Sequence, residues 1–201
     1  MAKIAVDVAL LPTEQIMDKA IEANRELLKQ YPDRIILDKE NCLPHISLAM
    51  GCIEDTNIAK IGDILRNIGA SHSPGQLYSD GMQTGKNARN EKVTVLQLKK
   101  TEPLQSLHEF VMQKLTPYFS YDVSADMVLS PPVACETTLL WIKNYPDKSS
   151  FEKFSPHITL GYGQIEHLSF PHEFTALSLA LCHLGNHCTC RRILASTAFQ
   201  S

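Results

Sequence analysis

Two segments of the sequence repeat one another and carry residues that can do chemistry. "PHISLAMGCIED" contains His45 and Ser47, and "PHITLGYGQIEH" contains His157 and Thr159; the two agree at seven of twelve positions without a gap. Successive side chains of a β-strand point to opposite faces. Each segment, as a strand, would bury its isoleucine and leucine and present an imidazole beside a hydroxyl on the other face.

Two imidazoles and two hydroxyls that face each other suit a transfer at phosphorus. The unperturbed pKa of histidine is about 6.5, so one ring can act as a base while the other, protonated, acts as an acid. Hydroxyl groups can donate hydrogen bonds to the oxygens of a tetrahedral anion. A single His-x-Ser on a strand is more often structural, but packing gives no reason to keep a histidine and a hydroxyl in both copies. We therefore interpret the paired motif as catalytic.

The segments around the two motifs follow one order. An apolar run at residues 3–10 precedes a helical pattern at 13–30, and a second run at 92–98 precedes a helical pattern at 102–115. Each of these strand–helix pairs leads into a motif, and another helix is expected at 57–69. The same order in both halves predicts two related lobes that each contribute one motif to a shared surface.

The remaining segments connect or complete these lobes. Residues 71–92 are polar and contain glycines, which indicates a long hairpin loop or a crossing between lobes. "TTLLWIK", residues 137–143, reads as a further strand. Two extended runs at the C-terminal side flank Gly185 and Asn186, a pattern typical of a hairpin with a two-residue turn.

These elements predict an α+β fold. We expect two pseudo-symmetric lobes, each with an antiparallel sheet and flanking helices, around a central groove. The whole chain, 1–201, would form a single bilobal domain whose halves are residues 1–75 and 90–201, with strand exchange between the lobes left open.

Composition limits the classes of function. The net charge of −3 argues against a general binder of long nucleic acid, which would carry a basic surface. No apolar stretch approaches the roughly 20 residues needed to cross a bilayer, and the first residues do not read as a signal peptide. The six cysteines are scattered, which favours reduced thiols. We expect a cytoplasmic monomer without cofactor or membrane contact.

The paired motif resembles the two-histidine (2H) phosphoesterase superfamily, the LigT-like or 2'-5' RNA ligase family. That family is marked by two His-x-Thr/Ser motifs on strands of two related lobes, and "HISL" and "HITL" match both copies. The resemblance implies metal-independent chemistry on 2',3'-cyclic phosphates or 2'-5' linkages at RNA or nucleotide ends. It also implies that His45 and His157 are the acid–base pair and that Ser47 and Thr159 bind the phosphate.

Two alternatives stay open. A non-catalytic module that binds RNA or nucleotides would keep the same groove without productive chemistry. A 2'-5' RNA ligase would use the same groups in the reverse direction, with RNA ends as substrates. The sequence does not tell which histidine is the base.

Three further features are candidates for binding. Tyr162, just past the second motif, could stack on a base of the substrate or could be a core residue. A short basic stretch, Lys86 to Lys92, could meet RNA phosphates or be a solvated loop. A two-residue turn at Gly185 would place zinc-type ligands on one face of the hairpin, although a fourth ligand is not evident and free cysteines are often simply buried; these ligands are His183, Cys188 and Cys190.

Overall fold

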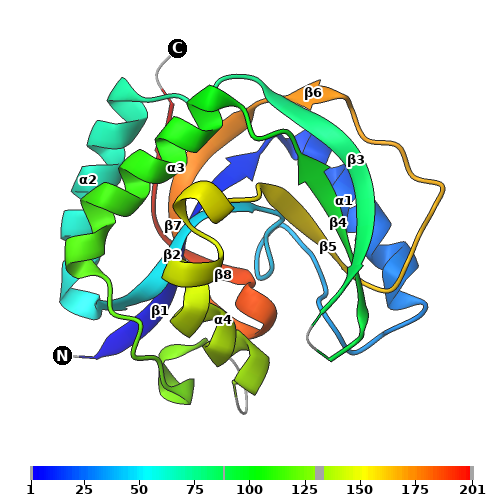
Figure 1. Cartoon of the computed structure of the whole chain (residues 1–201), viewed down its shortest axis with the longest axis horizontal. Coiled ribbons are helices and arrows are strands. Elements are labelled where there is room, and N and C mark those ends of the chain that lie inside the picture. The colour runs from blue at the N-terminus through cyan, green and yellow to red at the C-terminus, as the bar shows by residue number, and fades with distance from the viewer. Residues whose placement is uncertain (1, 88, 130–133, 200–201) are drawn as a thin grey trace.

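The computed structural model describes residues 2–87, 89–129 and 134–199. Its principal elements are eight strands and four α-helices in those ranges (Figure 1). The strands are β1 (Lys3–Pro12), β2 (Ile46–Glu54), β3 (Leu77–Lys86), β4 (Lys92–Leu98), β5 (His157–Tyr162), β6 (Glu173–Phe174), β7 (Ala176–Leu184) and β8 (Cys190–Ala198). The helices are α1 (Glu14–Leu28), α2 (Ile58–Ser71), α3 (Glu102–Leu115) and α4 (Glu136–Lys148).

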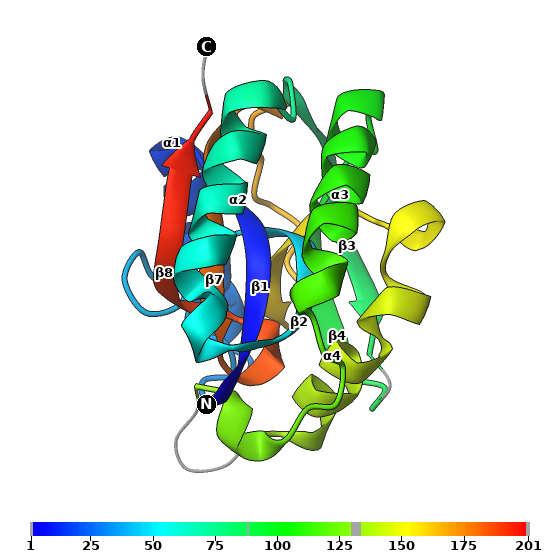
Figure 2. The same ribbon diagram turned by 90° about the vertical axis from the view of Figure 1, so that its left-hand side faces the viewer.

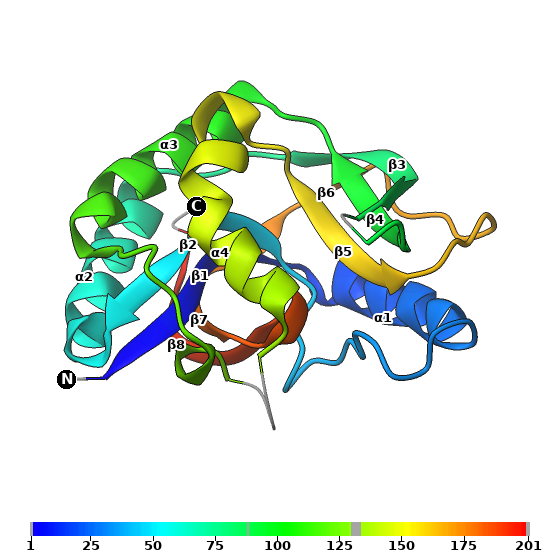
Figure 3. The same ribbon diagram turned by 60° about the horizontal axis from the view of Figure 1, so that its bottom comes forward.

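The strands form two antiparallel sheets of four. Their orders are β2-β1-β7-β8 and β5-β4-β3-β6, so each motif strand, β2 or β5, lies at the edge of its sheet. The two motif strands come together where the sheets meet (Figure 3). The predicted α+β fold with two pseudo-symmetric lobes is confirmed.

The two lobes match in register as well as in order. Ser47 lies opposite Ala9 on β1, and Thr159 lies opposite Val95 on β4. A bulge interrupts each pairing at the same place, directly before Ala9 and directly before Val95. Because a bulge bends a strand and changes where its side chains point, both motifs are aimed by the same local device.

The helices are exchanged between the lobes. α1 follows β1 of the first sheet but packs against β5 of the second, whereas α3 follows β4 of the second sheet but packs against β2 of the first. Figure 3 shows α1 beside β5, and Figure 2 shows α3 next to α2, which covers β7 and β8. Each motif strand is therefore supported by a helix that follows the other lobe's central strand.

A buried polar side chain on each exchanged helix fixes this support. Asn24 of α1 donates from Nδ2 to the carbonyl of Leu160 at 2.8 Å, and His108 of α3 donates from Nδ1 to the carbonyl of Leu48 at 2.6 Å. Leu48 and Leu160 hold equivalent positions in the two motifs. Buried hydrogen bonds of this kind are costly to break, so they set where each motif strand lies.

Strand β1 is buried on both faces, as expected for a strand covered on both sides. Val6 and Val8 face the main core, while Ala9 faces a smaller apolar cluster with Cys182 and Cys190. Asp7 interrupts this apolar strand with a fully buried side chain. A buried carboxyl inside a central strand is costly unless it has partners, so its environment is relevant to the site.

The strand expected at residues 137–143 is wrong, because this segment belongs to helix α4. Thr138, Ile142 and Tyr145 are buried at helical spacing, while Leu140 and Trp141 remain exposed. Seven mostly apolar residues fit both periods, so their pattern cannot separate a strand from a helix.

Two predictions about connections also need correction. Much of the segment 71–92 is not a loop, since Leu77–Lys86 forms β3 and pairs with β4 as a hairpin. The two-residue turn at Gly185 is wrong as well: Leu184 pairs with Cys190, and a short 3-10 turn lies between these two residues.

Within the described ranges, no helix combines the length and the apolar character that crossing a membrane requires.

Candidate active site

The two motifs line one pocket of about 550 Å³ between the lobes. His45 and Ser47 enter it from β2 and the residue before it, and His157 and Thr159 enter it from β5. The structure thus brings together all four residues that the sequence singled out. The arrangement follows from the shared register and bulge of the motif strands, which turn the same side chains inward in both lobes.

Each histidine is held by its own backbone. His45 Nδ1 lies 2.7 Å from the carbonyl oxygen of Leu43, and His157 Nδ1 lies 2.9 Å from that of Ser155. A carbonyl only accepts hydrogen bonds, so Nδ1 carries the proton in both neutral rings and Nε2 keeps its lone pair. Both rings are therefore oriented with Nε2 as the nitrogen that can react.

Burial sets the protonation of both rings. It lowers the pKa of His45 to about 4, although the hydrogen bond to Leu43 opposes this, and a charge on His157 would lower it further. The pKa of His157 is also lowered by loss of solvation, again opposed by its backbone hydrogen bond. At neutral pH both imidazoles are uncharged when considered singly, and an anion bound between them would raise both pKa values.

The two hydroxyl groups differ in their partners. Ser47 Oγ donates to Asp7 Oδ2 at 2.5 Å. Thr159 makes no side-chain hydrogen bond to any described residue. The threonine hydroxyl is therefore free for a ligand, whereas the serine hydroxyl is oriented by a buried carboxyl.

The pocket has a positive lining in a chain of negative net charge. Lys86, Lys148 and Lys153 lie along it, and no aspartate or glutamate does among the described residues. Charges of one sign along a concave surface concentrate ligands of the opposite sign. The pocket therefore favours an anionic ligand, which the overall charge of −3 concealed.

Tyr162 lines the pocket but is largely occupied by protein contacts. Its hydroxyl lies 3.1 Å from His187 Nδ1, and the Arg34 guanidinium sits 4.9 Å from the centre of its ring. Arg34 in turn pairs with Glu91. Because Arg34 covers the ring, Tyr162 offers less free surface for stacking on a base than the sequence suggested.

Other residues of the site were missed by sequence reasoning. Trp141 of α4 lines the pocket while 52% exposed, so it is the aromatic residue with a free face there. The sequence hid it because its segment was assigned to a strand. Asp7 was visible only as a charge inside an apolar run, and its closeness to Ser47 depends on a strand pairing that the sequence does not show.

The three zinc-type ligands considered on the C-terminal hairpin do not gather at one place among the described residues. His183 lies opposite Arg192 and its Nε2 is 3.0 Å from the carbonyl of Met127, while Cys190 lies opposite Leu184. Among the described residues, donor atoms of metal-ligand type gather within 4.8 Å at one place, formed by Asp7, His45 and Cys190. This group includes His45 of the first motif, so it is part of the candidate site and not a separate one.

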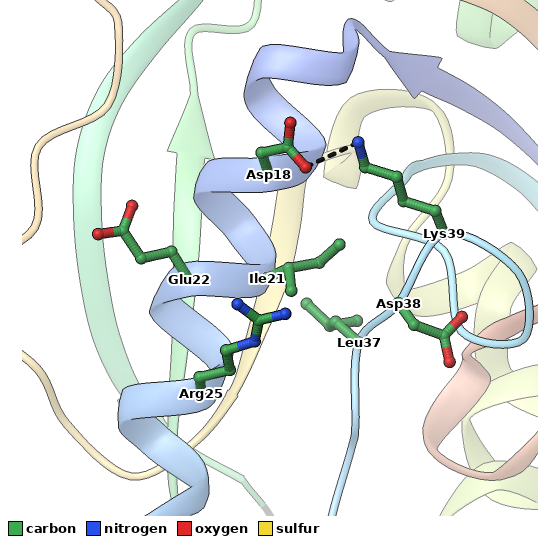
Figure 4. A pocket seen from close by; sticks show the side chains of 7 residues that line it. All are labelled: Asp18, Ile21, Glu22, Arg25, Leu37, Asp38 and Lys39. Carbon is green, nitrogen blue, oxygen red and sulfur yellow. Dashed lines mark ion pairs between the residues drawn. The ribbon is translucent and has the colours of Figure 1, made fainter.

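A second hollow, of about 530 Å³, lies between α1 and the segment that follows it (Figure 4). Lys39 at its edge is already paired with Asp18 at 2.7 Å and with Glu14 at 2.5 Å. Neither motif contributes to it. The hollow is therefore not a candidate for the chemistry that the motifs indicate.

The fold is shared with solved structures of low sequence identity. TT0787 of Thermus thermophilus superposes with a TM-score of 0.58 at 14% identity over 98% of both chains. Escherichia coli LigT in apo form gives a TM-score of 0.56 at 15% identity over 100% of both chains. LigT complexed with 3'-AMP gives a TM-score of 0.52 at 15% identity over the same share. No protein-family model and no curated protein matches the sequence.

Proposed function

We propose that the chain is a 2H phosphoesterase that opens or cleaves a ribose-linked phosphodiester without a metal ion. The observation that carries the proposal is the meeting of His45 and His157, each with Nδ1 bonded to a backbone carbonyl and a lone pair left on Nε2, in one pocket with two hydroxyls. The LigT-like fold supports it. The most suitable substrates are 2',3'-cyclic phosphates or 2'-5' linkages at RNA or nucleotide ends.

The proposed reaction needs one base and one acid. One Nε2 takes a proton from water, the water oxygen attacks phosphorus, and the bond from phosphorus to a ribose oxygen breaks. The other Nε2 gives a proton to that ribose oxygen. General acid–base groups typically contribute about 10²–10⁴-fold each. Thr159 would donate to a non-bridging oxygen, where negative charge increases in the transition state, and Ser47 would do the same once its hydroxyl hydrogen turns from Asp7 to the phosphate.

The lining of the pocket supports a nucleotide as ligand. Lys86, Lys148 and Lys153 would attract phosphate groups, and Trp141 offers a face for a base. Of the structures that share the fold, one is LigT in complex with 3'-AMP. A volume of about 550 Å³ leaves room for a substrate that extends past the reacting phosphate.

The test is hydrolysis of the four nucleoside 2',3'-cyclic monophosphates in EDTA between pH 5 and 9. The variants are His45→Ala and His157→Ala, and the matched control is His167→Ala, an exposed histidine outside the pocket. We expect each active-site variant to lose at least about 10²-fold in turnover and the control to keep its rate. Wild-type turnover in either active-site variant would refute the proposed roles.

Binding and ligation measurements separate the alternatives. Saturable binding without product from either cyclic nucleotides or 2'-5' linked oligonucleotides would favour a non-catalytic module. Formation of 2'-5' linkages from RNA ends would show that the chain works as a ligase.

A further inference from the structure

The two motif strands pair with their central strands in the same register, and at one position of that register the central strands differ in charge. Asp7 on β1 lies opposite Met50, and Val93 on β4 lies opposite Tyr162. Met50 and Tyr162 occupy the same position in the two motifs. One lobe therefore has a carboxyl group where the other has a valine, and only one histidine has a carboxyl beside it.

The carboxyl of Asp7 lies against both groups of the first motif. Its side chain is fully buried, its Oδ2 accepts the hydrogen bond from Ser47, and the same oxygen lies 3.6 Å from His45 Nε2. Oδ1 has no hydrogen-bond partner among the described residues. The equivalent valine shows that the fold does not need a carboxyl here, and an incompletely paired one is costly. The cost points to a role in the chemistry.

The contact is on the reacting nitrogen of His45. Nδ1 is already bonded to the carbonyl of Leu43, so a carboxyl at Nε2 is not needed to fix the tautomer. A carboxyl oxygen 3.6 Å from Nε2 is beyond hydrogen-bond length, and an approach by about 0.5 Å would bring it close enough to pass a proton to that nitrogen. This position differs from that of a carboxylate that orients a catalytic base through Nδ1.

Three other titratable groups around Asp7 stay neutral near pH 7. Burial raises the pKa of Cys190 on β8, of Cys188 in the 3-10 turn and of Tyr145 on α4. Cys182 of β7 lies directly opposite Asp7. Among the described residues His45 is the one ion-pair partner of Asp7, and His157 is the next imidazole beyond it. Asp7 and His45 are thus the neighbouring pair whose pKa values lie on either side of neutrality.

We infer that Asp7 is a positioning residue that shares one proton with His45, and that this pair makes His45 the acid and His157 the base of the proposed hydrolysis. The inference rests on the proposed function for its reaction step. His157 has no carboxyl beside it, so its free Nε2 takes the proton of water. The proton held between Asp7 and His45 goes from Nε2 to the ribose oxygen when the bond to phosphorus breaks. Exchange with solvent then removes the proton from His157 and restores one to the pair.

The titration properties agree with a shared proton. Burial raises the pKa of Asp7 to about 8, against the hydrogen bonds from Ser47 and Cys190, which lower it. The pKa of His45 is lowered to about 4. Between these values the two residues together hold one proton, and strongly interacting groups of this kind titrate as a pair.

The first experiment follows the proton without relying on turnover. NMR titration of the Asp7 carboxyl carbon and the His45 ring in the wild-type protein should show one proton leaving the pair near pH 8 and a second one binding near pH 4. An Asp7 carboxyl that ionises below pH 5, independently of His45, would overturn the inference. This result would decide the shared proton even if no substrate is turned over.

The second experiment is the pH–rate profile of Asp7→Asn, with Asp7→Val as a copy of the other lobe. A general acid must be protonated, so the rate falls above its pKa and the profile has an alkaline limb. Without Asp7 this limb should move to lower pH by at least about one unit. Turnover at pH 8 should then fall at least about tenfold. The acidic limb, set by His157, should not move. An unchanged profile in both variants would overturn the inference while leaving the proposed function intact.

A third readout separates proton donation from general damage. A nucleoside phosphodiester with a p-nitrophenolate leaving group needs no acid, so Asp7→Asn should lose much less rate on it than on cyclic phosphate. Equal losses on both substrates would show a merely structural role. Loss of all turnover in the wild type would instead refute the proposed function, and the NMR titration would still decide the shared proton.

Discussion

His45 and His157 make the same hydrogen bond, each from Nδ1 to the backbone carbonyl two residues earlier, at 2.7 and 2.9 Å. The bond belongs to the motif itself, because the carbonyl comes from the residue just before the shared proline. It orients each imidazole ring without help from a side chain of another element. The two lobes therefore orient their imidazoles identically, and differences between the histidines must come from their surroundings.

A first prediction concerns protons taken up on binding. Both rings have a lowered pKa, so an anion placed between them should raise these values and draw protons from solution. Calorimetry with inorganic sulfate at about pH 6.5, near the ordinary pKa of histidine, in two buffers of different ionisation enthalpy, should give different heats. Equal heats in both buffers would mean that neither ring is charged by the anion.

A second prediction concerns the hydroxyl group of Thr159. Thr159→Ala should lower turnover by about 10²-fold, as removal of one donor to a developing anion does in other enzymes. Thr159→Ser keeps the hydroxyl and should stay close to the wild type. Steady-state kinetics on a cyclic nucleotide would measure both, and full activity of Thr159→Ala would remove this residue from the phosphate site.

A third prediction concerns the free face of Trp141. Stacking on a base is worth about 1–3 kcal/mol, so Trp141→Ala should raise KM for an oligonucleotide by about fivefold or more, with less effect on turnover. Leu140→Ala is the matched control, because Leu140 is 51% exposed on the same helix but does not line the pocket. A similar KM in the two variants would place the base elsewhere.

A fourth prediction concerns stability and pH. The folded protein keeps a proton on Asp7 up to about pH 8, whereas the unfolded chain releases it near the ordinary aspartate pKa of 3.8, so this group makes stability fall as pH rises between these values. His45 acts in the opposite direction between about pH 4 and 6.5, because its folded pKa is lowered. Between about pH 4 and 6.5 the two effects on the free energy of unfolding nearly cancel. From about pH 6.5 to 8 the effect of Asp7 remains and lowers this free energy by about 2 kcal/mol in total.

Urea denaturation between about pH 6 and 8.5 measures this loss. Asp7→Asn cannot ionise, so it should lose less stability over this range and exceed the wild type at its alkaline end. The exposed Asp80→Asn should behave like the wild type. A wild-type stability that does not change over this range would show that Asp7 is ionised in the folded protein throughout.

The sequence predicted the parts of the fold that local pattern determines. The motif strands, the helices around them and the inward face of His45 and Ser47 follow from alternation and helical spacing, and the duplicated motif predicted two lobes. That residues 137–143 belong to a helix did not follow, because the pattern of this short, mostly apolar segment fits a strand equally well. The position of Trp141 beside the pocket was therefore not predicted either.

Long-range pairing was also beyond the sequence. The exchange of α1 and α3 depends on contacts such as Asn24 with Leu160, which lie far apart in the chain. The partner of Asp7 depends on a bulge beside Ala9, and no local pattern marks it. A charged residue inside an apolar strand was the one available signal, and its meaning required the structure.

The order of strands has a consequence for biosynthesis. β1 needs β7 as its second neighbour, and Cys190 of β8 packs against Asp7, so the surroundings of the first motif include residues near 180–190. A ribosome makes about 5–20 residues per second, and pairings of such sequence separation form late. The nascent chain would hold both histidines before it holds a working groove, and its chemistry would begin only when β7 and β8 have emerged and paired.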